Sequence, residues 1–438
     1  MNQVLRDKLK TLFFKYVEVA SPEICLKSFK NVDIKGKTLL VGVGKASIPY
    51  CEKIQDKIKS QYEGIIISTK IKNVSENLNN FKIFFAGHPV PNKNGLEASQ
   101  YLIEKVDKLE KNDLLIFLVS GGGSSLLPSP PEGFNLKDEI NLNKKLLYSG
   151  MNIKETNLVR KHFSMIKGGR LARLAYPSKV KTYVVSDIPG DDLSQVSSGP
   201  TLPSTGKPMD AIHCIEKYKV ILPKKILNHI KKNNDDIPCK TDIMFKNNSA
   251  YLLASAKKSM NATSNFAKLM NLEVIVISDQ SQGHATQVAK EHASFIKSYI
   301  EKIKFKKSKK IFCFISGGET SVKVINKNGK GGRNTEYLLS LAIELELLRV
   351  KSFVAIAADT DGIDGTEDNA GAIIDENTLF KIRNKNLSPD KLLIENNSYC
   401  AFKSSGELFI TGPTGTNVND FRAVLIKGHQ MEINYGKK

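Results

Sequence analysis

The sequence from Leu114 to Ser125 reads Leu-Leu-Ile-Phe-Leu-Val-Ser-Gly-Gly-Gly-Ser-Ser. Its six consecutive apolar residues carry no charge and predict a parallel strand that is buried on both faces. The glycines that follow allow a sharp turn that exposes backbone N–H groups. A strand that runs into a Gly/Ser loop at the carboxyl edge of a sheet is a common anion site in α/β proteins. From this stretch alone, a plain tight turn remains the alternative.

Further apolar runs predict more strands of the same kind. They lie at residues 38–44, 64–67, 83–85, 183–186, 251–254, 274–277, 311–315 and 353–357. Between them are stretches of helical periodicity, such as Val4–Val17 and Asn157–Arg170. On the second of these, Arg160, Ser164 and Lys167 would share one face and form a cationic stripe. Strands that alternate with helices favour an α/β fold with a mostly parallel sheet.

The length of 438 residues favours two or three domains. Lys217–Thr241 is rich in lysine, asparagine and proline and lacks a long apolar period, so we expect a boundary there, with domains at residues 1–238 and 239–438. In the second half, Ile311–Thr320 repeats the order of apolar strand, serine and two glycines. The repeat predicts that each domain offers a glycine loop to a shared cleft.

Lys and Arg exceed Asp and Glu by 65 to 45, which gives a net charge of +20. Such an excess is compatible with nucleic acid, a membrane surface or a small anionic substrate as partner. The lysines are scattered and no basic stretch is studded with aromatic residues, so we expect no nucleic-acid partner. The oligomeric state stays open between monomer and homodimer.

The six cysteines are far apart and none forms a Cys-x-x-Cys pair, which favours neither a zinc site nor a disulfide framework. The N-terminal residues lack the apolar core of a signal peptide. No apolar run approaches the roughly 18 residues that span a bilayer. We therefore expect a cytoplasmic protein without a membrane partner.

The predicted loops carry charged residues that suit phosphoryl transfer. In that reaction the protein mainly positions the reacting groups and neutralises the negative charge on the phosphoryl oxygens. Lys45 follows Gly44, and Arg333 follows several glycines at the start of a predicted helix. A Walker A loop is excluded because Gly44-Lys45 is followed by Ala46. The dinucleotide pattern that begins at Gly42 ends on Ser47 instead of a third glycine, which counts against a nicotinamide-dependent dehydrogenase.

Charged residues in the predicted loops also have purely structural interpretations. Lys45 could open a helix on the surface. Asp187, Asp191 and Asp192 could be turn residues or helix caps. His88 is better interpreted as a loop-packing residue than as an acid or base.

As a set, the loops resemble the class II glycerate kinases, the glycerate 2-kinase family with a C-terminal MOFRL domain. The residues that carry the resemblance, in the family's order, are Val41–Ala46, Gly87–Pro91, Ser120–Leu127, Asn157–Ala172, Ser186–Thr201, Ser316–Thr320, Gly331–Asn334, Thr360–Ala372 and Thr411–Asp420. The resemblance implies two α/β domains, the first Rossmann-like and the second containing the MOFRL region at about residues 309–425, with the active site in the interdomain cleft. One departure is Asp359, where the family more often has glycine.

The resemblance also implies ATP-dependent phosphorylation of D-glycerate at its 2-hydroxyl, with Mg²⁺. The family's proposed catalytic lysine and arginine fall on Lys45 and Arg333. The residues alone leave the 2- and 3-hydroxyl open. The alternative function is an oxidoreductase of the hydroxypyruvate reductase type, which acts on a related three-carbon acid.

We therefore predict a site with the following members. Lys45 and Arg333 neutralise the transferred phosphoryl group, and Asp187 is the candidate base. The residues expected to bind phosphate or nucleotide are Gly121, Gly122, Gly123, Ser124, Ser125, Gly317 and Gly318. Arg160 and Lys167 would hold the substrate carboxylate, and the candidate Mg²⁺ ligands are Asp187, Asp192 and Asp361.

Overall fold

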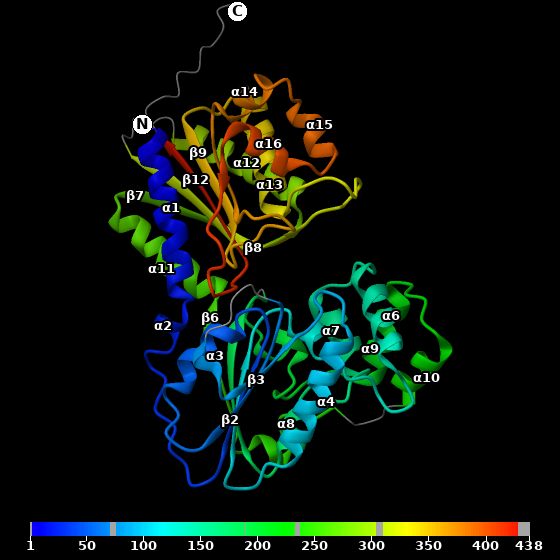
Figure 1. The fold of residues 1–438 in the computed structure, drawn as a ribbon. Coiled ribbons are helices and arrows are strands. Elements are labelled where there is room, and N and C mark those ends of the chain that lie inside the picture. Colours follow the sequence, from blue (N-terminus) through cyan, green and yellow to red (C-terminus); the bar gives the residue numbers. More distant parts are fainter. Residues whose placement is uncertain (1, 71–75, 189, 233–236, 304–309, 428–438) are drawn as a thin grey trace, which may run out of the picture. The chain divides into compact units, whose positions relative to one another are not determined.

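The computed structural model describes residues 2–70, 76–188, 190–232, 237–303 and 310–427. The chain divides into two compact units (Figure 1). The first unit consists of Pro22–Ser255, and the second combines Met1–Ser21 with Ala256–Lys438. Each unit has its own six-stranded sheet and its own helices, so the predicted α/β class is confirmed.

The sheet of the first unit is entirely parallel, with the strand order β3-β2-β1-β4-β5-β6. Its strands are β1 (Thr38–Val43), β2 (Tyr62–Ser68), β3 (Phe81–Phe85), β4 (Leu114–Val119), β5 (Lys179–Ser186) and β6 (Ser249–Ser255). Every residue of β1 and β4 is buried, as their unbroken apolar runs predict. This is the Rossmann order, whose direction reverses between β1 and β4. Ligands of such sheets bind at the carboxyl ends of the strands at this switch point.

Helices and short 3₁₀ turns connect these strands. They are α2 (Pro22–Cys25), α3 (Ser47–Gln55), η1 (Glu76–Leu78), α4 (Lys93–Asp107), α5 (Gly123–Leu126), α6 (Leu136–Leu147), α7 (Ile153–Lys161), α8 (Arg170–Ala175), η2 (Leu193–Ser198), α9 (Pro208–Lys217), α10 (Lys224–Lys232) and η3 (Ile243–Phe245). The main core lies around the central strands and includes Val41, Ile65 and Phe117. A smaller core, with Leu142 and Phe163, joins α6, α7, α9 and α10.

The sheet of the second unit is mixed, with the order β11-β10-β9-β12-β8-β7. Only β7 and β8 pair in parallel, and the other pairs are antiparallel. Its strands are β7 (Leu272–His284), β8 (Ile311–Ser321), β9 (Phe353–Asp359), β10 (Gly371–Asp375), β11 (Leu408–Phe409) and β12 (Asp420–Lys427). Its helices are α1 (Asn2–Val19), α11 (Ala256–Leu269), α12 (Ala285–Ile303), α13 (Arg333–Leu347), α14 (Thr378–Arg383), α15 (Pro389–Ile394) and α16 (Ser398–Ser405).

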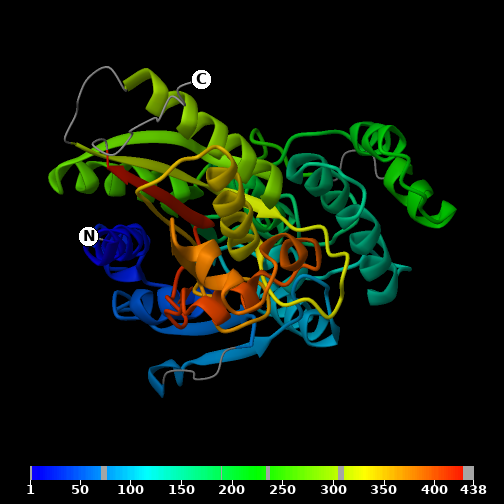
Figure 2. The ribbon, with the colours of Figure 1, turned by 90° about the horizontal axis from the view of Figure 1, so that it is seen from above.

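The side chains of β12 alternate between the two faces of this sheet, as in any strand. Val424 and Ile426 belong to the core formed with α12 and α13, which lie side by side (Figure 2). Phe421 points to the other face, where its ring packs against Tyr16 of α1 with centroids 5.0 Å apart. Among the described helices, none combines the length and apolar character needed to cross a membrane.

The division into units differs from the expected boundary at residues 238 and 239 in two places. Residues 239–255 fall in the first unit because β6 extends its sheet by pairing with β5. The opening helix α1 falls in the second unit, where Phe13 and Tyr16 are fully buried. The periodicity of α1 predicts an amphipathic helix, but periodicity does not specify which sheet its apolar face covers.

The predicted helix over residues 157–170 is wrong in its extent. Helix α7 ends at Lys161, and α8 begins at Arg170 after Gly168 and Gly169 adopt left-handed backbone angles. Arg160, Ser164 and Lys167 therefore do not share a helix face, and the predicted cationic stripe does not form.

Candidate active site

The loops after β1 and β4 meet at the switch point of the first sheet. Lys45 lies in the turn between β1 and α3, and its backbone N–H donates a hydrogen bond to the carbonyl of Gly121 (3.0 Å). The next residue, Ala46, donates its N–H to Ser120 Oγ (3.1 Å). These two bonds join the predicted lysine to the predicted anion loop, and Lys45 itself is half-buried.

The glycines of this loop allow functional side chains to approach its backbone. A Cβ at Gly121 would collide with Oδ2 of Asp187, which extends from the end of β5. A Cβ at Gly122 would lie 3.3 Å from the His88 ring and 3.5 Å from Cγ of Lys45. The structure therefore brings the predicted base and the predicted lysine to the same loop.

The serines of the loop belong to a network of hydroxyl groups. Ser124 Oγ lies 2.8 Å from Ser198 Oγ, which donates to Oδ1 of Asn157 (2.9 Å). Ser125 Oγ lies 2.9 Å from Nδ1 of His88. Ser198 was not among the predicted site residues. The signal that could have identified it is the pair of serines just before Gly199-Pro200.

Arg160 lies behind this network. Its Nε donates to Oδ1 of Asn143 (2.8 Å), and Nη1 lies 3.4 Å from Oδ1 of Asn157. Burial lowers the pKa of Arg160 to about 10, and the nearby carboxylate of Glu139 opposes this shift. Arg160 thus contacts Asn157, which in turn accepts from Ser198, and these contacts suit a positioning role.

Two lysines follow Arg160 in the chain, Lys161 and Lys167, and their surroundings differ. Lys167 Nζ donates to the carbonyl of Leu127 (2.8 Å) and forms an ion pair with Glu139 (3.0 Å) in which both side chains are only 2% exposed. A buried ion pair of this kind holds the ammonium in place, because breaking it would leave a charge without a partner. These contacts make Lys167 a structural residue rather than a substrate ligand.

Lys161 is the second buried lysine, and our sequence prediction missed it. Its aliphatic stem packs against Gly168, where a Cβ would lie 3.3 Å from Cβ and Cγ of the lysine. Burial lowers the pKa of Lys161 to about 8, and the carboxylate of Asp192 opposes that shift. The signal that was available is its position beside Arg160 in the cationic run of residues 160–162.

Asp192 caps the short helical turn η2. Its Oδ1 accepts from the backbone N–H and the hydroxyl of Ser194 (3.1 and 2.7 Å). Although burial would raise the pKa of Asp192, these bonds, a contact with Gln195 and the charge of Lys161 lower it. The capping role therefore explains the geometry of Asp192. The turn that it caps, η2, also carries Ser198.

In the second unit, Arg333 is the first residue of α13 and forms three ion pairs. Its Nε bonds to Asp420 (2.8 Å), Nη2 to Asp359 (2.6 Å) and Nη1 to Glu319 (2.8 Å). Burial would lower the pKa of Arg333, but these three carboxylates raise it well above its ordinary value. The side chains of Asp359 and Asp420 are 5% and 0% exposed, whereas that of Glu319 is 49% exposed. Glu319 is therefore the partner that an incoming anion could most easily replace.

The start of α13 is capped from within the protein. Oδ1 and Oδ2 of Asp364 accept from the backbone N–H groups of Asn334 and Thr335, both at 2.9 Å. Asp361 accepts from the N–H of Ile363 (2.9 Å) inside the same turn region. Across the described ranges, no group of three or more His, Cys, Asp or Glu side chains could hold a metal ion.

Gly317 and Gly318 do not form a loop, which corrects the expectation of a second glycine loop. Both lie inside β8, where Gly318 pairs with Asp420 of β12 and Gly317 pairs with Phe421. A Cβ at Gly318 would collide with the backbone of Ser281 in β7. Close strand packing therefore explains these glycines without a phosphate.

Comparisons with known proteins agree with this fold. A model described as a domain of unknown function, DUF4147, matches residues 8–231, and the MOFRL family matches residues 312–420. The chain is 36% identical to D-glycerate 2-kinase of Thermotoga maritima over 94% of this chain and 96% of that protein. It is 39% identical to a protein of Agrobacterium vitis, provisionally named a hydroxypyruvate reductase, over 89% of this chain and 100% of that protein.

The crystal structure of glycerate kinase from Thermotoga maritima is similar over 97% of this chain and 100% of that chain, with a TM-score of 0.81 and 34% sequence identity. The MOFRL match falls within the region expected from the resemblance. The family models and the identity to curated relatives over nearly the whole chain confirm the resemblance seen in the loops. The chain belongs to the glycerate 2-kinase family with a C-terminal MOFRL domain.

Proposed function

We propose that this chain is a glycerate kinase that transfers the γ-phosphoryl group of ATP to the 2-hydroxyl of D-glycerate, giving 2-phosphoglycerate and ADP. The observation that carries this proposal is the meeting of Lys45 with the Gly121–Ser125 loop at the switch point of a Rossmann sheet. Backbone N–H groups, hydroxyls and a cation at this edge suit phosphoryl oxygens. The relative from Thermotoga maritima named D-glycerate 2-kinase supports the choice of substrate and hydroxyl.

In the proposed reaction, Asp187 accepts the proton of the 2-hydroxyl while the hydroxyl oxygen bonds to the γ-phosphorus. The bond between that phosphorus and the bridging oxygen of ADP breaks, and ADP leaves with the electron pair. Lys45 is a compact cation that neutralises the phosphoryl oxygens, and backbone N–H groups of the Gly121–Ser125 loop donate to them. Arg333 would supply a second, permanently charged group.

For the substrate carboxylate we propose Lys161 in place of Lys167. The ammonium of Lys167 is engaged by Glu139 and by a carbonyl. Lys161 belongs to α7, which packs against the turn η2 that carries Ser198. Arg160 keeps a supporting role, in which it orients Asn157 and thereby the hydroxyl network.

The carboxylates at the strand ends fit Mg²⁺ as well as a proton acceptor. Mg²⁺ is usually held by one or two protein carboxylates together with substrate phosphates, so a cluster of three is not required. Asp187 is the candidate ligand in the first unit and Asp361 in the second, whereas Asp192 is already engaged as a cap. When bound, Mg²⁺ would neutralise the charge on the phosphate oxygens.

The test is an incubation of the protein with ATP, Mg²⁺ and D-glycerate, followed by phosphorus NMR of the products. We expect 2-phosphoglycerate and an equal amount of ADP. Formation of 3-phosphoglycerate would contradict the proposed hydroxyl, and the absence of any phosphoglycerate would contradict the kinase activity.

The name of the relative from Agrobacterium vitis makes hydroxypyruvate reduction the second candidate function. The Rossmann strand order is compatible with a dinucleotide, but Ser47 stands where the fingerprint requires its third glycine. NADH consumption with hydroxypyruvate separates the two candidates, and we expect none.

A further inference from the structure

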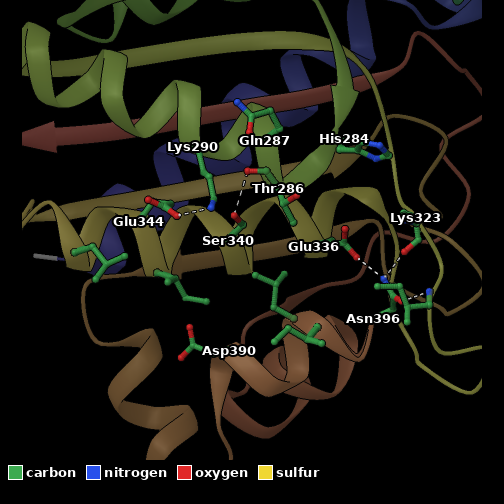
Figure 3. Close-up of a pocket in the computed structure, with 15 residues that line it drawn as sticks. His284, Thr286, Gln287, Lys290, Lys323, Glu336, Ser340, Glu344, Asp390 and Asn396 are labelled. Atoms are coloured by element: carbon green, nitrogen blue, oxygen red, sulfur yellow. Dashed lines mark hydrogen bonds and ion pairs between the residues drawn. The ribbon is translucent and has the colours of Figure 1, made fainter. Parts of the chain in front are cut away.

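Two adjoining cavities open along one face of α13 in the second unit. The smaller has a volume of about 390 Å³, and its lining residues include Arg333, Thr320, Ser321 and Thr366. The larger has a volume of about 710 Å³ (Figure 3). Both are lined by Glu336 and Asn396, so these two side chains mark where the cavities adjoin.

The residues of α13 that face this groove recur every three or four positions. They are Arg333, Glu336, Ser340, Ile343, Glu344 and Leu347. A rise of 1.5 Å per residue places Arg333 and Ile343 about 15 Å apart along the helix axis. The groove is therefore long enough for an extended ligand, and its chemistry changes along its length.

A buried carboxylate lies at the junction. Glu336 is only 7% exposed, and its Oε2 accepts from Nδ2 of Asn396 (3.0 Å). Asn396 also accepts the backbone N–H of Ile325 (2.7 Å) and donates to the carbonyl of Lys323 (3.2 Å). The asparagine thus holds the loop after β8 beside the carboxylate.

The far end of the groove combines apolar side chains with the charged groups of Lys290, Glu344 and Asp390. Ile343 and Leu393 are half-buried in its wall, and Ile394 is 67% exposed at its edge. Figure 3 shows Lys290 and Glu344 together at this end, with Ser340 between them and Glu336. Large exposed apolar side chains gathered around a hollow indicate a binding surface.

We propose that this face of α13 is the nucleotide site, with the phosphates beside Arg333, the ribose at Glu336 and the base between Ile343 and Leu393. This inference rests on the proposed kinase function and names the part of the protein that holds its phosphoryl donor. A ligand with an anionic end, a diol and a flat apolar end matches the three sections in this order. A carboxylate is a common acceptor for ribose hydroxyls in nucleotide sites.

Two features decide the orientation. Arg333 lies at one end of the groove, among the lining residues Thr320, Ser321 and Thr366, and its exposed partner Glu319 is the one that a phosphate would replace. At the other end, the ammonium of Lys290 is paired with Glu344 (3.5 Å), and the apolar side chains of the groove gather there, at Ile343, Leu347, Leu393 and Ile394. The phosphates therefore belong at the start of α13 and the base towards its end.

The first experiment measures ADP binding to the full chain by calorimetry, without glycerate. Ile343→Trp fills the apolar section, and Glu336→Gln removes the charge without changing the shape of the side chain. We expect each to weaken ADP binding about tenfold. The control is Leu269→Trp, at an exposed leucine of α11 in the same unit, which should bind ADP as the wild type does.

The second experiment tests the ribose contact with 2′-deoxy-ADP and 3′-deoxy-ADP. The wild type should bind at least one of them about tenfold more weakly than ADP, whereas Glu336→Gln should bind that analogue and ADP equally. If Glu336→Gln loses the same factor as the wild type with both analogues, the carboxylate does not contact the ribose and the assignment is wrong. Because Glu336→Gln is isosteric, this comparison remains available if Ile343→Trp does not fold.

Glycerate phosphorylation separates this inference from the proposed function. If the wild type phosphorylates glycerate and both variants bind ADP normally, the kinase assignment stands and the nucleotide site is wrong. If both variants lose ADP binding but the wild type never phosphorylates glycerate, the nucleotide site stands and the substrate is wrong.

Discussion

Two stretches with the same order of residue types adopt different structures. In both, an apolar strand is followed by serine and two glycines, at Ser120-Gly121-Gly122 and at Ser316-Gly317-Gly318. The first stretch leaves the sheet after Val119, with Gly122 in a left-handed conformation. The second continues inside β8 to Ser321.

The neighbouring strands explain this difference. The neighbours of β4 are parallel to it, and pairing with β1 ends at Val43, whose carbonyl accepts the N–H of Ser120, so the ladder does not reach the glycines. The neighbour β12 of β8 is antiparallel and begins at Asp420, opposite Gly318, so the ladder extends through the glycines. In this chain, the Gly-Gly pair forms a loop where strand pairing ends and stays within the strand where pairing continues.

The surroundings of the two stretches differ accordingly. Gly121 faces the carboxylate of Asp187, and the carbonyl of Gly121 accepts the backbone N–H of Lys45. Gly317 faces Met260 and Tyr16, which are core side chains. Only the first stretch is expected to affect phosphoryl transfer, and the variants below test that difference.

The largest effect is expected from Lys45→Ala. Removing a cation from the transferring phosphoryl group should lower kcat on glycerate by about 10²–10³-fold, the usual cost of losing one electrostatic stabiliser. Arg333→Ala should have an effect of the same order. The control is Lys53→Ala on the exposed side of α3, which should retain wild-type turnover. Near-normal turnover in both Lys45→Ala and Arg333→Ala would contradict the proposed roles.

A direct comparison of the two stretches comes from Gly121→Ala and Gly317→Ala. The new Cβ at Gly121 would collide with Asp187, and a displacement of about 1 Å at a reacting group costs roughly 10²-fold in rate. At Gly317 the nearest atoms are the end of the Met260 side chain at 3.0 Å and the Tyr16 hydroxyl at 3.3 Å, which can adjust. We expect a loss in kcat only for Gly121→Ala. Equal losses would show that both stretches serve the reaction.

The sequence was sufficient to predict the elements that local patterns determine. The apolar runs of β1 and β4, the turn that carries Lys45 and the helix start at Arg333 are all observed. Long-range pairing determines the rest. The ladder between β8 and β12, the attachment of α1 to the second sheet and the pairing of Lys167 with Glu139 join residues far apart in the chain. No local spacing specifies such partners.

The two buried lysines of the first unit offer a smaller contrast. Lys161→Met should raise KM for glycerate about tenfold with little change in stability, because it removes an anion-binding charge. Lys167→Met should instead lower the free energy of unfolding by about 3–5 kcal/mol, because it leaves Glu139 buried without its partner. Steady-state kinetics and denaturant unfolding of both variants measure this difference. An unchanged KM in Lys161→Met would remove Lys161 from the site.

The pKa of Lys161 gives this contrast a pH dependence. Burial lowers that pKa to about 8, so the ammonium loses its proton as pH rises above 8. KM for glycerate should therefore rise between pH 8 and 9 in the wild type. Lys161→Arg keeps its charge over this range and should remove the rise. If the rise persists in Lys161→Arg, another group causes it.

The smallest expected effect uses one buried histidine in each unit. Burial lowers the pKa of His162 in the first unit and of His292 in the second to about 4, and the nearby charges of Arg170 and Arg422, respectively, add to the shift. The unfolded chain has the ordinary histidine pKa of about 6.5 and binds more protons between pH 6.5 and 4. Each histidine should therefore lower the free energy of unfolding by up to about 1.4 kcal/mol for every pH unit of acidification in that window.

Hydrogen exchange at pH 6.5 and 5.0 can assign this loss to each unit, with α7 as reporter for His162 and α12 for His292. His162→Gln should reduce the acid-induced loss of protection in α7 and leave that of α12 unchanged, and His292→Gln should do the reverse. The charged neighbours of His162 are mostly cationic, since Lys161 and Arg170 disfavour its protonation and only Asp210 favours it. If α7 loses protection equally in the wild type and in His162→Gln, acid acts on the first unit through a different group, and the buried ring is not its sensor.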